Sequence, residues 1–175
     1  MKHLRYASYV IRHKWFVFVE CCKLGIPLAG IVHDWSKLLP CEWMPYAEFF
    51  YGGAERRNAG GTYKGPPTEH TDFDRAWNHH QKCNPHHWQY WVIFEDSGKI
   101  FALDMPLRYR KEMLADWRGA GRAITGKTET AAWYSRNKNK MLLHPATRHW
   151  IEDKLQLARS GERRTAIILD DFAAL

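Results

Sequence analysis

Apolar side chains recur every three to four positions through most of this 175-residue chain. That spacing places them on one face of an α-helix, so it predicts a mainly helical fold. Proline suits the first turn of a helix and glycine the position after its last turn, and these two residues mark several of the expected ends. The predicted helices cover residues 4–24, 27–37, 40–51, 73–83, 106–118 and 145–159.

One stretch departs from the helical pattern. Residues 91–94 and 100–103 are rich in β-branched and aromatic residues and flank the turn sequence Asp-Ser-Gly-Lys, which is typical of a β-hairpin. Three further segments, residues 52–67, 119–131 and the tail after Gly161, lack a clear pattern, and the first is interpreted as a mobile surface loop. We therefore predict a single-domain helical bundle spanning residues 1–175, with one small hairpin around residues 91–103.

The formal net charge of +7 favours anionic partners, such as a nucleotide, another phosphorylated small molecule or a nucleic acid. Signal-peptide features are not apparent, and the apolar run at residues 15–19 is too short to span a membrane, so we expect a cytoplasmic location and no membrane partner. The cysteines lack the C-x-x-C spacing of a zinc ribbon. They are Cys21, Cys22, Cys41 and Cys83.

Four histidines lie within nine residues, as two adjacent pairs on either side of Asn84-Pro85. Imidazole is the commonest protein ligand of transition metals, and a buried ring needs partners for its polar atoms. His80 continues a stripe that begins at Phe73, so it is predicted to face the interior, whereas His79 is expected at the surface or behind a ligand. The turn at Asn84-Pro85 can bring His86 or His87 back beside His80. At least one of this second pair is predicted to bind metal.

A His-Asp pair stands upstream, at His33-Asp34. The carboxylate of Asp34 could bridge two cations or position a water molecule, although an ion pair with Lys37 is the plainer interpretation. His13 lies on the preceding helix, which should pack antiparallel to the next one across a tight corner at Gly25. It reaches His33 only if the two helices tilt or the turn between them is irregular, and it is otherwise a core-edge or surface histidine.

A further carboxylate ligand is expected from later in the chain. Asp116 lies among apolar neighbours inside a predicted helix, where an acidic side chain is unexpected unless it binds something. Glu112 lies on the same face of that helix and could assist Asp116 in binding a metal. Asp104 is the alternative, but its place before Met105-Pro106 suits a helix N-cap. We favour Asp116.

The order His13, His33-Asp34, His80, His86 or His87, then Asp116 resembles the His … His-Asp … His … His … Asp order of two-metal members of the HD-domain phosphohydrolase superfamily. The resemblance implies an HD-like bundle holding one or two divalent ions (Zn, Mn, Fe, Co or Ni) that activate water against a phosphoester. It implies catalytic roles for Asp34 and Lys37. Phosphate contacts are expected from Lys37, Arg75, Arg108 and Lys111.

A second resemblance covers roughly residues 5–155. The strings that carry it are His33-Asp-Trp-Ser-Lys37, Pro45-Tyr-Ala47, Ala76-Trp-Asn-His-His80, Asn84-Pro-His-His-Trp88 and Glu112-Met-Leu-Ala-Asp-Trp117. They are similar to a family of short phage and bacterial proteins of unknown function.

The functional prediction is therefore a metal-dependent phosphohydrolase acting on a nucleotide or another small phosphate ester. The alternative is a non-enzymatic, basic nucleotide- or nucleic-acid-binding protein, with a structural metal site or none. The many aromatic residues are also compatible with a homo-oligomer.

Overall fold

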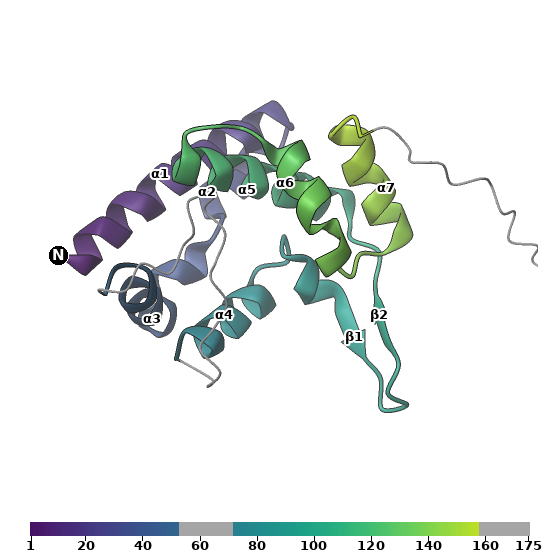
Figure 1. Cartoon of the computed structure of the whole chain (residues 1–175), viewed down its shortest axis with the longest axis horizontal. Coiled ribbons are helices and arrows are strands. Elements are labelled where there is room, and N and C mark those ends of the chain that lie inside the picture. The colour runs from purple at the N-terminus through teal and green to yellow at the C-terminus, as the bar shows by residue number, and fades with distance from the viewer. Residues whose placement is uncertain (53–71, 158–175) are drawn as a thin grey trace, which may run out of the picture.

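The structure of the protein is a computed structural model, which describes residues 1–52 and 72–157 (Figure 1). It is mainly helical with one two-stranded antiparallel hairpin, which confirms the predicted fold class. The elements, with η for 3-10 helices, are α1 (Lys2–Lys23), α2 (Pro27–Val32), η1 (Trp35–Leu38), α3 (Pro40–Tyr51), α4 (Asp72–Cys83), η2 (Trp88–Trp91), β1 (Val92–Phe94), β2 (Ile100–Ala102), α5 (Leu107–Thr125), α6 (Thr130–Asn137), η3 (Lys138–Lys140) and α7 (Pro145–Lys154).

Helix α1 organises the fold, because it packs against α2, α3 and α5 (Figure 1). Its buried face combines apolar and polar side chains in one stripe, with His13 between Val10 and Val17. Val10 belongs to an aromatic-rich core shared with α3 and α4. Val17 belongs to a second cluster that includes Ala115 of α5. The α1 stripe therefore places a buried histidine between two apolar clusters.

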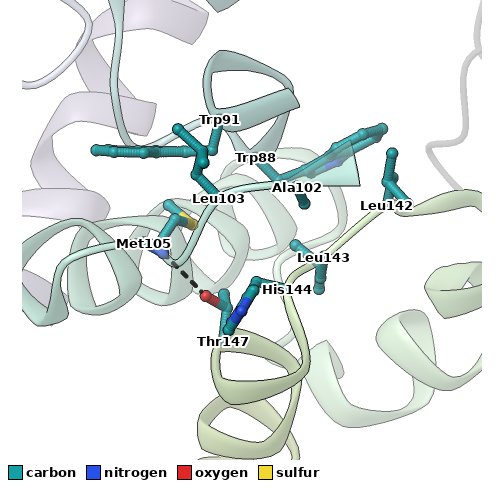
Figure 2. A pocket seen from close by; sticks show the side chains of 9 residues that line it. All are labelled: Trp88, Trp91, Ala102, Leu103, Met105, Leu142, Leu143, His144 and Thr147. Carbon is teal, nitrogen blue, oxygen red and sulfur yellow. Dashed lines mark hydrogen bonds between the residues drawn. The ribbon is translucent and has the colours of Figure 1, made fainter. Parts of the chain in front are cut away.

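The hairpin is confirmed with the expected turn. Val92 pairs with Ala102 and Phe94 with Ile100, and Gly98 adopts a φ of +83° that a side chain would disfavour. The hairpin extends away from the helices (Figure 1). A groove between its base and the start of α7 is lined by Trp88, Trp91, Ala102, Leu103, Met105, Leu142, Leu143, His144 and Thr147 (Figure 2). Because it has no interior space for a water-sized molecule, this groove is a packing contact rather than a ligand site.

Two predicted helix ends are wrong. The helix expected over residues 27–37 stops at Val32, and His33 and Asp34 lie in the break before η1. The helix expected to end at Gly119–Gly121 continues to Thr125 and ends at Gly126, whose φ is +74°. Gly119 is a contact point instead: a Cβ there would lie 2.5 Å from Cγ2 of Val17.

The last predicted helix is also shorter than expected. It ends at Lys154 rather than at residue 159, and residues 158–175, with the predicted ambiguous tail, lie outside the described residues. Most of the segment interpreted as a mobile loop, residues 53–67, also lies outside them. Residues 119–131, expected to be loop-like, instead form the end of α5 and the start of α6. Among the helices that the structure describes, none combines the length and apolar character needed to cross a membrane.

Candidate metal centre

The break after α2 turns the His33-Asp34 pair into the protein. Asp34 adopts a left-handed backbone conformation, with φ at +53°, which Asp tolerates better than most residues because its short side chain can bond locally. The Lys14 ammonium donates to the carbonyl of His33 and fixes the break against α1. Both side chains of the pair are only 1% exposed. A buried carboxylate and a buried imidazole thus lie side by side at the end of a short helix.

One set of potential ligands surrounds Oδ2 of Asp34. His13 Nε2 lies 3.0 Å from this oxygen and His33 Nε2 lies 3.3 Å from it. Oδ1 of Asp116, on α5, lies 3.3 Å from His13 Nε2 and 3.5 Å from His33 Nε2. These four side chains, here called the His13 group, each offer one ligand atom within 4.8 Å of the others. Two imidazoles and two carboxylates could hold a divalent cation.

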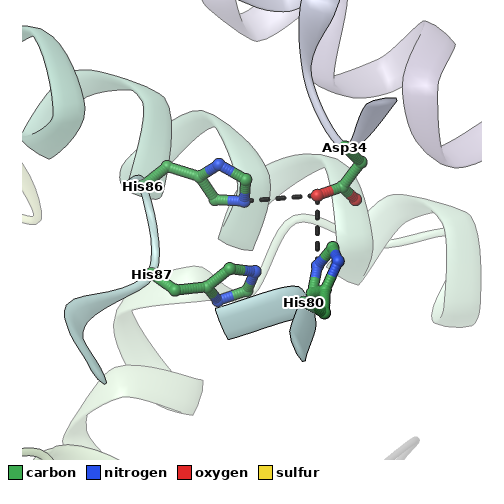
Figure 3. A group of neighbouring side chains, drawn as sticks. All are labelled: Asp34, His80, His86 and His87. Carbon is green, nitrogen blue, oxygen red and sulfur yellow. Dashed lines mark ion pairs between the residues drawn. The ribbon is translucent and has the colours of Figure 1, made fainter. Parts of the chain in front are cut away.

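A second set surrounds the other oxygen of the same carboxylate (Figure 3). His80 Nε2 lies 3.2 Å from Oδ1 of Asp34, and His86 Nε2 lies 3.3 Å from it. The His87 ring points into the same space in Figure 3, and all four ligand atoms lie within 4.8 Å of one another. We call Asp34, His80, His86 and His87 the His80 group. Asp34 is therefore common to both groups, with a different oxygen toward each.

Four buried polar atoms of the His80 group lack hydrogen-bond partners among the residues that the structure describes. Asp34 Oδ1, His80 Nε2, His86 Nε2 and His87 Nε2 are all buried, and none has a hydrogen-bond partner in the described part of the chain. Leaving a buried polar atom unsatisfied costs about 1–3 kcal/mol, so four such atoms facing one another need an explanation. A cation would satisfy all four at once. Three imidazoles with one carboxylate could hold a divalent first-row transition metal such as Zn, Mn, Fe, Co or Ni.

The chain that carries the second set of histidines is folded back by Asn84. His80 comes from the buried stripe of α4, which also contains Phe73 and Ala76, as the sequence predicted. At the end of this helix, Asn84 Nδ2 donates to the carbonyl of His80 at 2.8 Å and to Ser36 Oγ at 2.7 Å. His86 and His87 follow within the next turn. Asn84 thereby joins the end of α4 to η1 and returns both histidines toward Asp34.

Carboxylates also support the rings from behind. Glu112 Oε1 lies 3.1 Å from Nδ1 of His33 and 3.2 Å from Nδ1 of His86. Glu42 Oε2 lies 2.8 Å from Nδ1 of His80. A ring nitrogen that donates to a carboxylate leaves the opposite nitrogen free as an electron-pair donor, the usual arrangement around metal-bound histidines.

The charges at the centre favour ionised carboxylates, but they do not keep every imidazole neutral. Burial opposes protonation of His33 and His80, yet Asp34 raises the pKa of His33 well above its ordinary value and also raises the pKa of His80. Burial opposes ionisation of Asp34, but His33 and Lys37 hold the pKa of its carboxyl well below the ordinary value. Burial also disfavours the charged form of Lys37, yet the Asp34 carboxylate, 2.5 Å from its Nζ, raises the pKa of this lysine well above the ordinary value. Burial and the neighbouring His86 ring lower the pKa of His87 well below its ordinary value, which keeps this ring neutral. Ionised carboxylates and neutral imidazoles are the forms that bind metals, so a cation would have to displace protons from His33 and His80.

The structure brings together every residue predicted as a ligand. These are His13, His33, Asp34, His80, His86, His87 and Asp116. The alternatives lie elsewhere: Asp104 binds Arg110 and Thr147, and the partly exposed His79 binds the other oxygen of Glu42 at 2.7 Å.

Lys37 is at the centre, but the other predicted phosphate contacts are not. Arg75 pairs with Asp72 at the surface, with its side chain 83% exposed. Arg108 is exposed and lies over the ring of Tyr109. Within the described residues, neither of these arginines nor Lys111 forms an ion pair or hydrogen bond with the His13 or His80 group, so their role in phosphate binding stays a prediction.

Two supporting residues, Glu42 and Ser36, were missed by the sequence analysis. The turn at Asn84-Pro85 was predicted, but not the hydrogen bonds that the Asn84 side chain donates. A signal existed for Glu42, because it lies one turn before Tyr46 and shares its buried face, where a carboxylate is out of place. Neither Ser36 nor its hydrogen bond with Asn84 gave a comparable signal. Their importance depends on the contact between η1 and the end of α4, which links residues 48 positions apart.

Comparison with known proteins places the chain in a family without assigning an activity. The family model described as "Family of unknown function (DUF5662)" matches residues 2–157. No curated protein and no solved structure matches the chain. Because the match covers nearly all of the described residues, the chain belongs to the DUF5662 family.

Proposed function

We propose that this protein is a metal-dependent phosphohydrolase that acts on a nucleotide or another small phosphate ester. The observation that carries the proposal is the position of Asp34, whose two oxygens face two separate sets of buried ligand atoms. The order of these residues along the chain is the one that resembles two-metal HD-domain phosphohydrolases. When bound, divalent ions would polarise phosphoryl oxygens and lower the pKa of water.

Side chains of the protein would position the cations and bind the phosphate. Asp34 joins the two groups and holds the ammonium of Lys37 beside them. That ammonium lies 2.5 Å from Oδ2 of Asp34, and it is suited to neutralise a phosphate oxygen. The net charge of +7 favours the approach of an anionic substrate.

Metal content and hydrolysis test the proposal together. Freshly purified protein should contain a transition metal, and it should release phosphate from at least one member of a panel of nucleotides and simple phosphate esters. A chelator should stop the release, and added Mn²⁺, Zn²⁺ or Co²⁺ should restore it.

Adjacent histidines on α4 provide a matched pair of variants. His80→Ala should abolish turnover, because it removes a ligand of the His80 group, whereas His79→Ala should retain most of it, because His79 belongs to neither group. Full activity in a folded His80→Ala variant, or wild-type protein without bound metal, would contradict the proposal.

One observation favours a second candidate, a metal site that only stabilises the fold. Asp34, His80 and His86 are at most 2% exposed, as a closed structural site would require. The two functions differ in the fate of His80→Ala. Loss of a structural ligand should unfold the protein, while loss of a catalytic ligand should leave a folded, inactive protein.

A further inference from the structure

The two groups share more than Asp34. On the opposite side of the rings from Asp34, a single oxygen of Glu112 lies 3.1 Å from Nδ1 of His33 and 3.2 Å from Nδ1 of His86. His33 belongs to the His13 group and His86 to the His80 group. The two rings are close neighbours, with centroids 4.3 Å apart. One buried carboxylate oxygen therefore contacts one ring of each group.

We propose that Glu112 is a positioning residue that couples the two groups, so that the binding of one cation depends on the ring orientation that also serves the other. This inference rests on the metal binding assumed in the proposed function, but not on the reaction. Glu112 is not proposed as a ligand.

The tautomer of each ring supports this assignment. A neutral imidazole carries one proton, and a proton on Nδ1 that is donated to Glu112 leaves a lone pair on Nε2. In both rings Nε2 is the nitrogen that faces Asp34, at 3.3 Å from Oδ2 for His33 and 3.3 Å from Oδ1 for His86. The contact of His33 with Glu112 has hydrogen-bond geometry, and that of His86 is an ion-pair contact at 3.2 Å. A proton on Nδ1 of both rings would satisfy Glu112 and direct both lone pairs toward the shared carboxylate.

The alternative, that Glu112 binds a cation together with these two rings, conflicts with the same geometry. His33, His86 and Glu112 do offer atoms within 4.8 Å of one another. However, the contacts with Glu112 use the Nδ1 atoms, and each ring has only one lone pair when neutral. A lone pair on Nδ1 would leave the two Nε2 atoms protonated and facing Asp34, and both rings would be lost from the His13 and His80 groups.

Placement of Glu112 follows from its helix. It lies four residues before Asp116, so both carboxylates project from the same face of α5. Asp116 joins the His13 group directly, while Glu112 reaches the rings from behind. Burial opposes ionisation, but its contacts with His33 and His86 lower the pKa of Glu112 to about 2, so the carboxylate is a charged acceptor at neutral pH.

Glu42 provides the matched control. It is also buried and also contacts Nδ1 of a histidine from one of the groups, but that histidine is His80, so it supports one group only. Glu112→Gln and Glu42→Gln make the same chemical change and differ in the number of groups affected.

The test is a titration of metal-free protein with Co²⁺ or Zn²⁺ in competition with a chelator, without any phosphate ester. Wild type should bind two ions in two resolved steps. Glu112→Gln should weaken both steps by about 10- to 100-fold each, whereas Glu42→Gln should weaken one step by that factor and leave the other unchanged. A single step in wild type, or a folded Glu112→Gln variant in which only one step or neither step weakens, would overturn the inference.

A measurement on wild type keeps the inference testable if Glu112→Gln does not fold. In the zinc-loaded protein, ¹⁵N spectra of the histidine side chains should show the proton on Nδ1 in both His33 and His86. A proton on Nε2 of either ring would contradict the proposed role. Neither experiment requires turnover. Failure of the hydrolysis assay would therefore leave the coupling by Glu112 testable, and failure of the coupling would not exclude hydrolysis.

Discussion

Asp34 combines an unusual backbone conformation with a buried carboxylate that several side chains contact. It is one of two non-glycine residues with positive φ among those described, and such conformations cost about 1–3 kcal/mol and cluster at functional sites. Its carboxylate faces imidazoles from α1, from α4 and from the turn after α4, and it also holds Lys37. The sequence could indicate that His33-Asp34 was chemically important, but it did not reveal the left-handed conformation, which depends on these distant contacts.

Replacement of Asp34 by Asn tests both of its roles. Asn retains the shape and tolerates positive φ, but the charge that offsets the Lys37 ammonium is lost. We expect Asp34→Asn to lower the free energy of unfolding of the metal-free protein by about 3–5 kcal/mol, because a buried ammonium is left unpaired. We also expect it to abolish binding of both ions.

The double variant Asp34→Asn/Lys37→Met separates the two effects. It should recover most of the stability, measured by urea unfolding, without recovering metal content. A single variant as stable as wild type that still binds two ions would show that Asp34 is not the common member of the groups.

At the scale of elements, helical periodicity predicted most of the helices, and the β-rich segments around a turn sequence predicted the hairpin. The glycines of α5 and the break after Val32 were misinterpreted. Gly119 resembles a helix stop in sequence because glycine is frequent after the last turn. In the structure it allows α5 to approach the backbone of α1, a role that depends on a residue far away in the sequence. A short sequence pattern indicates only the helix propensity of its own segment. It does not distinguish a glycine that ends a helix from one that permits close contact between two helices.

Two glycines of α5 allow a direct comparison. In Gly119→Ala the new Cβ would lie 2.5 Å from Cγ2 of Val17 and 2.7 Å from its backbone nitrogen, so we expect a loss of about 1–3 kcal/mol in the free energy of unfolding. In Gly121→Ala the nearest atom is the Lys127 carbonyl oxygen at 3.4 Å, and we expect a gain of about 0.5–1 kcal/mol from the higher helix propensity of alanine. Urea denaturation measures both, and equal effects would refute the proposed close approach.

Over the whole molecule, the candidate metal ligands were more predictable than the residues that support them. The residue types, their order and the helical stripe of His80 were enough to nominate all seven members of the two groups. Glu42, Ser36 and Asn84 depend on how η1, α3 and α4 meet, which no spacing in the sequence reveals. The residue types along the chain are therefore enough to infer that these side chains meet at one site. The orientation of the histidine rings can be derived only from the three-dimensional structure.

Stability of the whole chain should depend on free metal. If Zn²⁺ binds the folded protein alone, a free concentration 100 times the dissociation constant stabilises it by about 2.7 kcal/mol. Thermal unfolding with and without a chelator should show this as a higher Tm in the presence of Zn²⁺. Mg²⁺ is the control, because it prefers oxygen ligands and should give a much smaller shift. Identical Tm values in all three conditions would argue against both groups as cation sites.

The contact between His33 and Glu112 joins residues that are 79 positions apart. A cation held by the His13 or His80 group would close backbone loops of comparable size, as a disulfide does, but this cross-link would form and break with the supply of ion. The lifetime of the folded chain would then vary with the metal status of the cell. Under metal starvation, proteolysis would remove the protein sooner.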